Sequence, residues 1–294
     1  MANLDVAKLR AEYEGPHEFI QTSDGKTLFV RRWTSRAEAP ASVLILHGIT
    51  GYSGPYGPMV AEQVAGAGFD VFGLDLRGHG LSDGRRGDYP SRERLVKDLG
   101  ETLTHIRSKS KKLVVMGHSL GALPAIVATK NNPQLIDGLV LVSAAKKVRT
   151  GVYPKPSAGA MLKMLIGVAI LRGTPVIEYR REGQVGLDDP LFNFHYSARF
   201  YSVLYGIGAL KVVSMMREGL VESPNLGFDD KLHIPLFLAV GENDELFNVD
   251  GVREFCDGIP CDDKEFHAIP GASHAVWPKG SFDPLVQWLG DKFH

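Results

Sequence analysis

A serine between two glycines lies where a predicted strand changes directly into a predicted helix. The apolar run 112–116 predicts a buried strand, Gly117-His118-Ser119-Leu120-Gly121 follows it, and 122–130 predicts a helix. So sharp a turn leaves almost no room for side chains beside the serine, which favours glycine there and directs the hydroxyl outward. The motif therefore restricts this part of the chain to strand, tight turn and helix, and makes Ser119 a candidate nucleophile.

Short apolar runs alternate with helical patterns on both sides of this turn. The other predicted strands are 17–22, 27–33, 42–46, 70–74, 138–142, 234–240 and 265–269, and the other predicted helices are 58–66, 91–107, 249–257 and 282–293. The first two strands flank Asp24-Gly25, a hairpin signal. Continuous apolar strands separated by helices predict an α/β fold with a mostly parallel central sheet and helices on both faces.

The alternation stops after the sixth predicted strand. Residues 146–231 contain no obvious strand pattern, and 161–171 is apolar nearly all round. Apolar residues recur further along at helical spacing, at Tyr196, Phe200, Val203, Ile207 and Leu210. We expect a helical cap, or lid, at 146–231, inserted into a core made of 1–145 and 232–294.

Charge and composition exclude several classes of protein. The 294 residues carry a net charge of −1, so no extended basic surface for nucleic acid is expected. The longest apolar run, 158–171, contains Lys163 and is shorter than a membrane span. The first 15 residues lack the apolar segment of a signal peptide. We therefore expect a soluble, cytoplasmic protein without a transmembrane segment.

Two cysteines, Cys256 and Cys261, are too few for a disulfide framework and are predicted to be free thiols or one local bridge. The histidines and carboxylates have no metal-ligand spacing, and the glycines form no nucleotide-binding pattern. We expect no metal and no cofactor. For His47, His79 and His118, which lie beside glycines, packing and loop hydrogen bonds are the expected roles.

A serine nucleophile needs a base within hydrogen-bond reach and a third group that orients the base. His274 lies in a glycine-containing loop after the last predicted strand, whereas His267 lies inside that strand. The strand before it ends in Gly241-Glu242-Asn243-Asp244-Glu245, which offers three carboxylates. The sequence thus predicts His274 as the base and an acid among these three residues.

The chain resembles the α/β-hydrolases, and within them the monoacylglycerol lipase and lysophospholipase-like branch. The resemblance covers nearly the whole chain and rests on Leu46-His47-Gly48, the segment 75–84, and the segments 117–121, 241–244 and 271–274. It implies that Asp244 is the acid, with Glu242 and Glu245 as alternatives. It also implies a lid over Ser119 and an acyl pocket beneath the lid.

The attack on an ester carbonyl builds negative charge on its oxygen, which backbone N–H groups must stabilise. In this fold one amide follows the nucleophile and another comes from the loop after the third strand. We therefore predict an oxyanion hole formed by the amides of Leu120 and Ile49.

The expected activity is hydrolysis of carboxylic esters by Ser119, His274 and Asp244 through an acyl-enzyme, with a small acyl ester and water as the partners. The apolar insertion favours lipid-like esters, such as monoacylglycerols or other medium-chain esters. A thioesterase, a peptidase, a carbon–carbon bond hydrolase and a non-catalytic binding protein on the same scaffold are the alternatives. Candidate pocket or lid residues are Met161, Met164, Leu165, Phe200 and Leu204.

Overall fold

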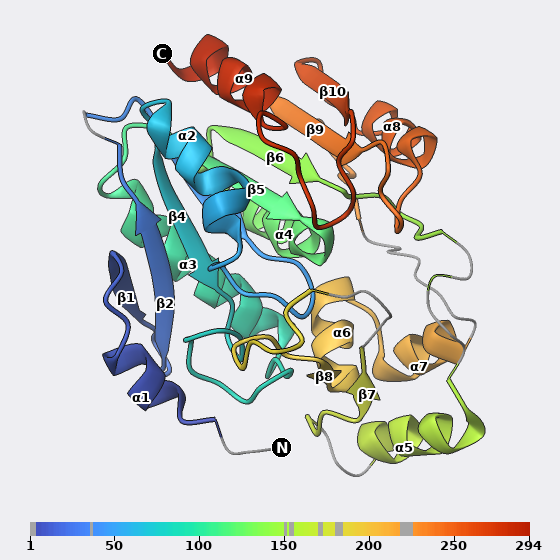
Figure 1. Cartoon of the computed structure of the whole chain (residues 1–294). Coiled ribbons are helices and arrows are strands. Elements are labelled where there is room, and N and C mark those ends of the chain that lie inside the picture. The colour runs from blue at the N-terminus through green and yellow to red at the C-terminus, as the bar shows by residue number, and fades with distance from the viewer. Residues whose placement is uncertain are drawn as a thin grey trace.

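The computed structural model of the chain describes residues 4–35, 38–149, 152, 156–169, 173–179, 185–217 and 226–294. Its centre is an eight-stranded sheet with the spatial order β1-β2-β4-β3-β5-β6-β9-β10 (Figure 1). Its strands are β1 (His17–Gln21), β2 (Thr27–Trp33), β3 (Ser42–Leu46), β4 (Asp70–Asp75), β5 (Leu113–His118), β6 (Gly138–Val142), β9 (Leu236–Gly241) and β10 (Lys264–Ile269). β2 is antiparallel to β1 and β4, and the other neighbours pair in parallel. The predicted fold class is confirmed.

Helices cover both faces of this sheet (Figure 1). One face packs against α3 (Arg92–Arg107), α4 (Ala122–Asn131) and α8 (Val249–Asp257), and the other against the π-helix η1 (Gly57–Ala61), α2 (Glu62–Gly66) and α9 (Asp283–Phe293). In β5, Val115 belongs to the core cluster that includes Leu99 of α3, whereas Met116 belongs to the cluster with Trp288 of α9. Because successive strand residues point to opposite faces, the continuous apolar pattern fills both cores.

Three short elements complete the body of the molecule: the helix α1 (Val6–Ala11) and the 3-10 helices η2 (Ser119–Gly121) and η3 (Pro133–Leu135). The predicted helix 58–66 begins one residue earlier and is π-helical in its first half. In the described part of the chain, no helix combines the length and the hydropathy needed to span a bilayer. Cys256 and Cys261 are both buried free thiols, so no local bridge forms between them.

The segment 146–231 contains α5 (Ala158–Ala169), β7 (Ile177–Glu178), β8 (His195–Tyr196), α6 (Ala198–Tyr205) and α7 (Ala209–Arg217). Figure 1 shows these elements together on one side of the sheet. α6 contributes Phe200 to the core cluster that contains residues of α3 and α4. Parts of the segment, including 150–151, 170–172, 180–184 and 218–225, lie outside the described residues. Its boundaries as a cap remain a prediction.

Two expectations for this segment are wrong. It contains a strand pair, since β7 and β8 are antiparallel partners, although each has only two residues. The helical face predicted from Tyr196 to Leu210 is also interrupted. Ser197 caps α6 by accepting a hydrogen bond from the backbone N–H of Phe200, so Tyr196 lies before the helix. Gly206, with φ of 65°, ends α6, and Leu210 belongs to α7.

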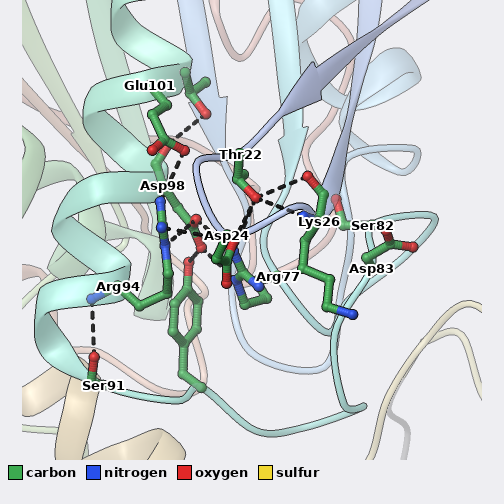
Figure 2. A network of polar contacts seen from close by, with 12 residues as sticks. Thr22, Asp24, Lys26, Arg77, Ser82, Asp83, Ser91, Arg94, Asp98 and Glu101 are labelled. Atoms are coloured by element: carbon green, nitrogen blue, oxygen red, sulfur yellow. Dashed lines mark hydrogen bonds and ion pairs between the residues drawn. The ribbon is translucent and has the colours of Figure 1, made fainter.

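A network of polar and charged side chains, most of them buried, joins the β1–β2 turn to α3 beyond the end of β4 (Figure 2). Asp98 accepts two hydrogen bonds from Arg77 (2.7 and 2.8 Å) and one from the Tyr89 hydroxyl (2.5 Å). Arg94 Nε lies 2.8 Å from Asp98, and Arg77 also contacts Asp24 at 2.9 Å. We call these five residues the flank network. It fixes the hairpin and the loop after β4 to helix α3.

Candidate active site

Ser119, Asp244 and His274 come together because of the direction of three strands. Ser119 directly follows β5, Asp244 follows β9, and His274 follows β10. β5, β6, β9 and β10 form a continuous parallel set, so the loops after them open at the same edge of the sheet. Residues far apart in the chain therefore meet in space.

The imidazole of His274 lies between the other two side chains. Its Nε2 is 2.9 Å from Ser119 Oγ, and its Nδ1 is 3.0 and 3.2 Å from the two carboxylate oxygens of Asp244. These distances are within hydrogen-bond range. The arrangement has the form that nucleophile activation requires: a hydroxyl, a base in contact with it, and an acid that orients the base.

The backbone of Ser119 is strained, with φ of 54° in a residue other than glycine. Its flanking glycines make this turn possible. A Cβ on Gly117 would lie 2.5 Å from the carbonyl oxygen of Gly121, and a Cβ on Gly121 would overlap the carbonyl oxygen of Leu46. The glycines thus allow helix α4 to pack against the strand ends while the serine side chain stays at the edge of the sheet.

Asp244 is the one of the three candidate carboxylates that contacts the His274 ring. It is completely buried and accepts hydrogen bonds from the backbone N–H groups of Leu246 (2.8 Å) and Phe247 (2.9 Å). Burial alone would raise the pKa of Asp244, but the hydrogen bond and charge of His274, with the Phe247 amide, lower it to about 2. Asp244 therefore stays ionised at neutral pH. Glu245 instead accepts from the His274 backbone N–H at 3.0 Å.

The loop after β3 passes close to the serine. A Cβ on Gly48 would lie 3.2 Å from Ser119 Cβ, which is tighter than nearly all such contacts, so glycine allows the close approach. Ile49 comes next and lines the cavity beside Ser119. Leu120 is the second residue of η2, and the first N–H groups of a helix have no partner within it. The oxyanion role of the Ile49 and Leu120 amides stays a prediction.

His118 connects the loops around the serine. Its Nε2 lies 2.9 Å from the carbonyl oxygen of His274, so this nitrogen carries the proton and donates. Its Nδ1 then accepts from the Tyr56 hydroxyl at 2.8 Å, while Tyr56 accepts from the Gly48 N–H at 3.0 Å. Burial, and then the charge of His274, lower the pKa of His118 to about 3, which keeps the ring neutral. The expected role in loop hydrogen bonding fits these contacts.

His47 and His79 are buried in the same way. His47 Nε2 accepts from the backbone N–H of Leu76 at 3.1 Å, and His79 Nδ1 donates to the carbonyl oxygen of Arg77 at 3.1 Å. Burial lowers the pKa of both imidazoles. These contacts are those of structural histidines, as expected.

A cavity of about 290 Å³ opens beside Ser119 and His274. Its lining comes largely from loops, and its apolar residues include Ile49, Met59, Val185, Phe192, Leu246 and Val276. The five predicted pocket or lid residues all lie in the segment 146–231 but are not among those that line the cavity. Met164, Phe200 and Leu204 are buried in the hydrophobic core, Met161 packs against that core, and Leu165 is 43% exposed. At four of the five positions apolar helical spacing identified packing residues, because the cavity is formed by loops that have no periodic pattern.

Comparison with known proteins identifies the family. The Hydrolase_4 family model, described as serine aminopeptidase, S33, matches residues 37–278. The monoglyceride lipase of Rattus norvegicus is 25% identical over 277 residues, which cover 89% of this chain and 83% of that protein. The monoacylglycerol lipase structure from Paleococcus ferrophilus has a TM-score of 0.62 at 25% identity and covers 90% of this chain and 99% of its own.

The fold is also shared with a soluble variant of the monoglyceride lipase from Saccharomyces cerevisiae, with a TM-score of 0.68 at 18% identity and coverage of 96% of this chain and 97% of that one. The family match extends over most of the chain and over all the strands from β3 to β10. The chain therefore belongs to the Hydrolase_4 family and is a carboxylic ester hydrolase of the monoacylglycerol lipase-like branch of the α/β-hydrolases.

Proposed function

We propose that the protein hydrolyses lipid-like carboxylic esters, such as monoacylglycerols or other medium-chain acyl esters, through an acyl-enzyme on Ser119. The observation that carries the proposal is the position of the His274 imidazole, 2.9 Å from the Ser119 hydroxyl and 3.0 Å from the Asp244 carboxylate. An imidazole with these two partners can remove the serine proton while the carboxylate stabilises the resulting positive charge.

In the first half of the reaction, Ser119 Oγ attacks the ester carbonyl carbon and its proton passes to His274 Nε2. The carbonyl oxygen becomes an oxyanion that accepts hydrogen bonds from the amides of Ile49 and Leu120. When the carbon–oxygen double bond reforms, the alcohol leaves and takes the proton from Nε2. The acyl group remains on Ser119.

In the second half, water replaces the alcohol. His274 removes a proton from the water as its oxygen attacks the acyl carbon, and the same two amides stabilise the second oxyanion. Collapse of this intermediate breaks the bond to Ser119 Oγ, which recovers the proton from His274. The fatty acid leaves, and the enzyme returns to its starting state.

The lining of the cavity supports an apolar acyl substrate. Ile49, Phe192, Leu246 and Val276 offer apolar surface within the cavity that contains Ser119 and His274. Ligand sites of this kind combine a mostly apolar lining with a few polar groups that fix orientation. Relatives named monoglyceride lipase and phospholipase are consistent with a lipid ester as substrate.

A chain-length series of p-nitrophenyl esters tests the substrate class. We expect kcat/KM to rise from acetate to octanoate, because the acyl chain gains apolar contacts in the cavity. Monoacylglycerols and lysophospholipids then compare headgroups, and amino-acid p-nitroanilides test the peptidase alternative. A maximum at acetate with no activity on octanoate contradicts the lipid-like substrate.

The nucleophile is tested separately. Ser119→Ala should lower kcat by roughly 10⁴- to 10⁶-fold, as expected for loss of the attacking group. A fluorophosphonate probe should label the wild-type protein and not this variant. Folded wild-type protein that hydrolyses esters but resists the probe would contradict Ser119 as nucleophile.

The base makes a prediction about pH. The rate should rise from acid to neutral pH, because His274 must be neutral to accept the serine proton. A flat profile of kcat/KM across this range contradicts the assignment of His274.

A further inference from the structure

Thr50 follows Ile49 in the loop after β3 and has an unusual backbone. Its φ is 65°, in the left-handed region that β-branched residues rarely adopt, and it is only 4% exposed. Such a conformation persists only where the surroundings hold it in place. The contacts of Thr50 therefore show what fixes this part of the loop.

Two residues of the segment 146–231 hold the backbone of Thr50. The Thr50 N–H donates to the hydroxyl of Tyr196 at 2.7 Å, and the Thr50 carbonyl accepts from the backbone N–H of Asn193 at 2.8 Å. Tyr196 is completely buried, and its ring contacts that of Phe200 at a centroid distance of 4.6 Å. Its hydroxyl therefore has a fixed position.

The same segment contacts the loop again two residues later. The Tyr52 hydroxyl donates to Asp189 at 2.7 Å, and the Tyr52 ring packs edge-on against Phe192 at 5.5 Å. The segment is itself attached to the body of the molecule. Ser197 Oγ donates to Asp88 at 2.6 Å, and Ser197 N–H donates to the Gly87 carbonyl at 2.9 Å.

The amide of Ile49 lies between two fixed neighbours. The N–H before it, that of Gly48, donates to the Tyr56 hydroxyl at 3.0 Å. The N–H after it, that of Thr50, donates to the Tyr196 hydroxyl at 2.7 Å. The carbonyl of the same peptide, that of Gly48, accepts from His47 Nδ1 at 2.9 Å. With this contact and the fixed peptide groups on both sides, the planar peptide unit that carries the Ile49 N–H has little freedom to rotate.

We propose that Tyr196 is a positioning residue for the oxyanion hole, which it orients through Thr50 without touching the substrate. The inference rests on the proposed function, since it concerns the Ile49 amide of that mechanism. An N–H fixed in advance stabilises a developing oxyanion more than one that must reorganise. The segment 146–231 thus supplies part of the catalytic geometry of the core.

Tyr196→Phe in the full chain tests the proposal, because it removes one hydroxyl and keeps the ring. We expect kcat on the best p-nitrophenyl ester to fall by about 10-fold or more, while KM changes little. The loss should stay smaller than the roughly 10²–10³-fold cost of removing an oxyanion donor outright, because the Ile49 N–H is still present. An alkyl boronic acid, whose tetrahedral serine adduct places an oxygen in the oxyanion site, should bind more weakly by about the same factor.

Tyr89→Phe is the matched control. Tyr89 is as buried as Tyr196, and its hydroxyl hydrogen bonds to Asp98 in the flank network, so the same atom is lost in a different place. We expect lower stability and unchanged kcat. A second variant, Thr50→Gly in the Tyr196→Phe background, should recover part of kcat, because glycine adopts the left-handed conformation without strain.

The outcomes separate the two proposals. If Tyr196→Phe keeps wild-type kcat and boronate affinity, or loses no more of either than Tyr89→Phe, the positioning role is wrong. It is also wrong if the double variant recovers nothing. Ester hydrolysis by the wild type that survives Ser119→Ala contradicts the proposed function itself, whatever Tyr196→Phe does.

Discussion

Two clusters of polar side chains, the flank network and the candidate active site, differ in whether their protons can be transferred. In the flank network Asp98 lies against Arg77 and Arg94 (Figure 2), and it also accepts a hydrogen bond from the Tyr89 hydroxyl. In the candidate active site the carboxylate of Asp244 instead contacts the imidazole of a histidine, His274. Arginine keeps its proton at any ordinary pH, whereas histidine exchanges its proton near neutrality.

The pKa shifts of the charged groups differ between the two clusters in the same way. Burial alone would lower the pKa of Arg77, but Asp98 and Asp24 raise it above its usual value, so the network holds permanent charges. The carboxylate of Asp244, with its pKa lowered to about 2, can instead stabilise a charge that appears on His274 only during the reaction. One arrangement is suited to stability, and the other to proton transfer.

Among the tests of this comparison, removing the charge of Asp244 should have the largest effect. We expect Asp244→Asn to lower kcat by about 10⁴-fold, because the amide neither fixes the imidazole tautomer nor stabilises its charged form. Circular dichroism should show an unchanged fold. Glu242→Gln, at an exposed position in the same loop, is the control and should keep wild-type kcat. A loss of kcat below 10-fold in Asp244→Asn would remove the contrast with the flank network.

The corresponding change in the flank network should affect stability instead. Asp98→Asn leaves Arg77 and Arg94 buried with less compensation, which typically costs about 3–5 kcal/mol. We expect the free energy of unfolding, measured with urea, to fall by this order while kcat per folded molecule is unchanged. A fall in kcat without a fall in stability would mean that the two clusters are coupled.

The smallest effect concerns pH and His118. Its pKa is lowered from 6.5 to about 3 in the folded protein, so between these values the unfolded chain binds a proton that the folded chain does not. Stability therefore falls as pH decreases through this window, by about 1.4 kcal/mol per pH unit for this one group. His118→Gln should make urea-derived stability less steep between pH 6 and pH 4. An unchanged slope would show that His118 does not stay neutral when folded.

The strands, Ser119 and His274 could be placed from the sequence because each depends on local pattern and chain order, whereas only the resemblance to α/β-hydrolases selects Asp244 among the three carboxylates after β9. Apolar runs predict buried strands, and parallel strands bring the loops after them to one edge. That edge is where the structure brings the three side chains together. Their catalytic roles remain predictions for the experiments above.

The cavity lining and the strand pair β7–β8 could not be predicted in this way. Residues such as Phe192 and Val276 reach the cavity from irregular segments, which have no periodic signal. Two-residue strands are too short to produce alternation. Tyr196 matched a helical face by spacing, and only its contact with Thr50 distinguishes it from a packing residue.

Because residues 189–199 are attached to the body of the molecule, the segment 146–231 cannot be exchanged as an independent unit. Asn193 and Tyr196 bond to Thr50, while Ser197 and Arg199 bond to Asp88. Exchange of the whole segment 146–231 for that of a relative would remove these contacts. In a chimaera that replaces part of this segment, the exchanged stretch should end before residue 189. The protein then keeps its own residues that hydrogen bond to the loop after β3.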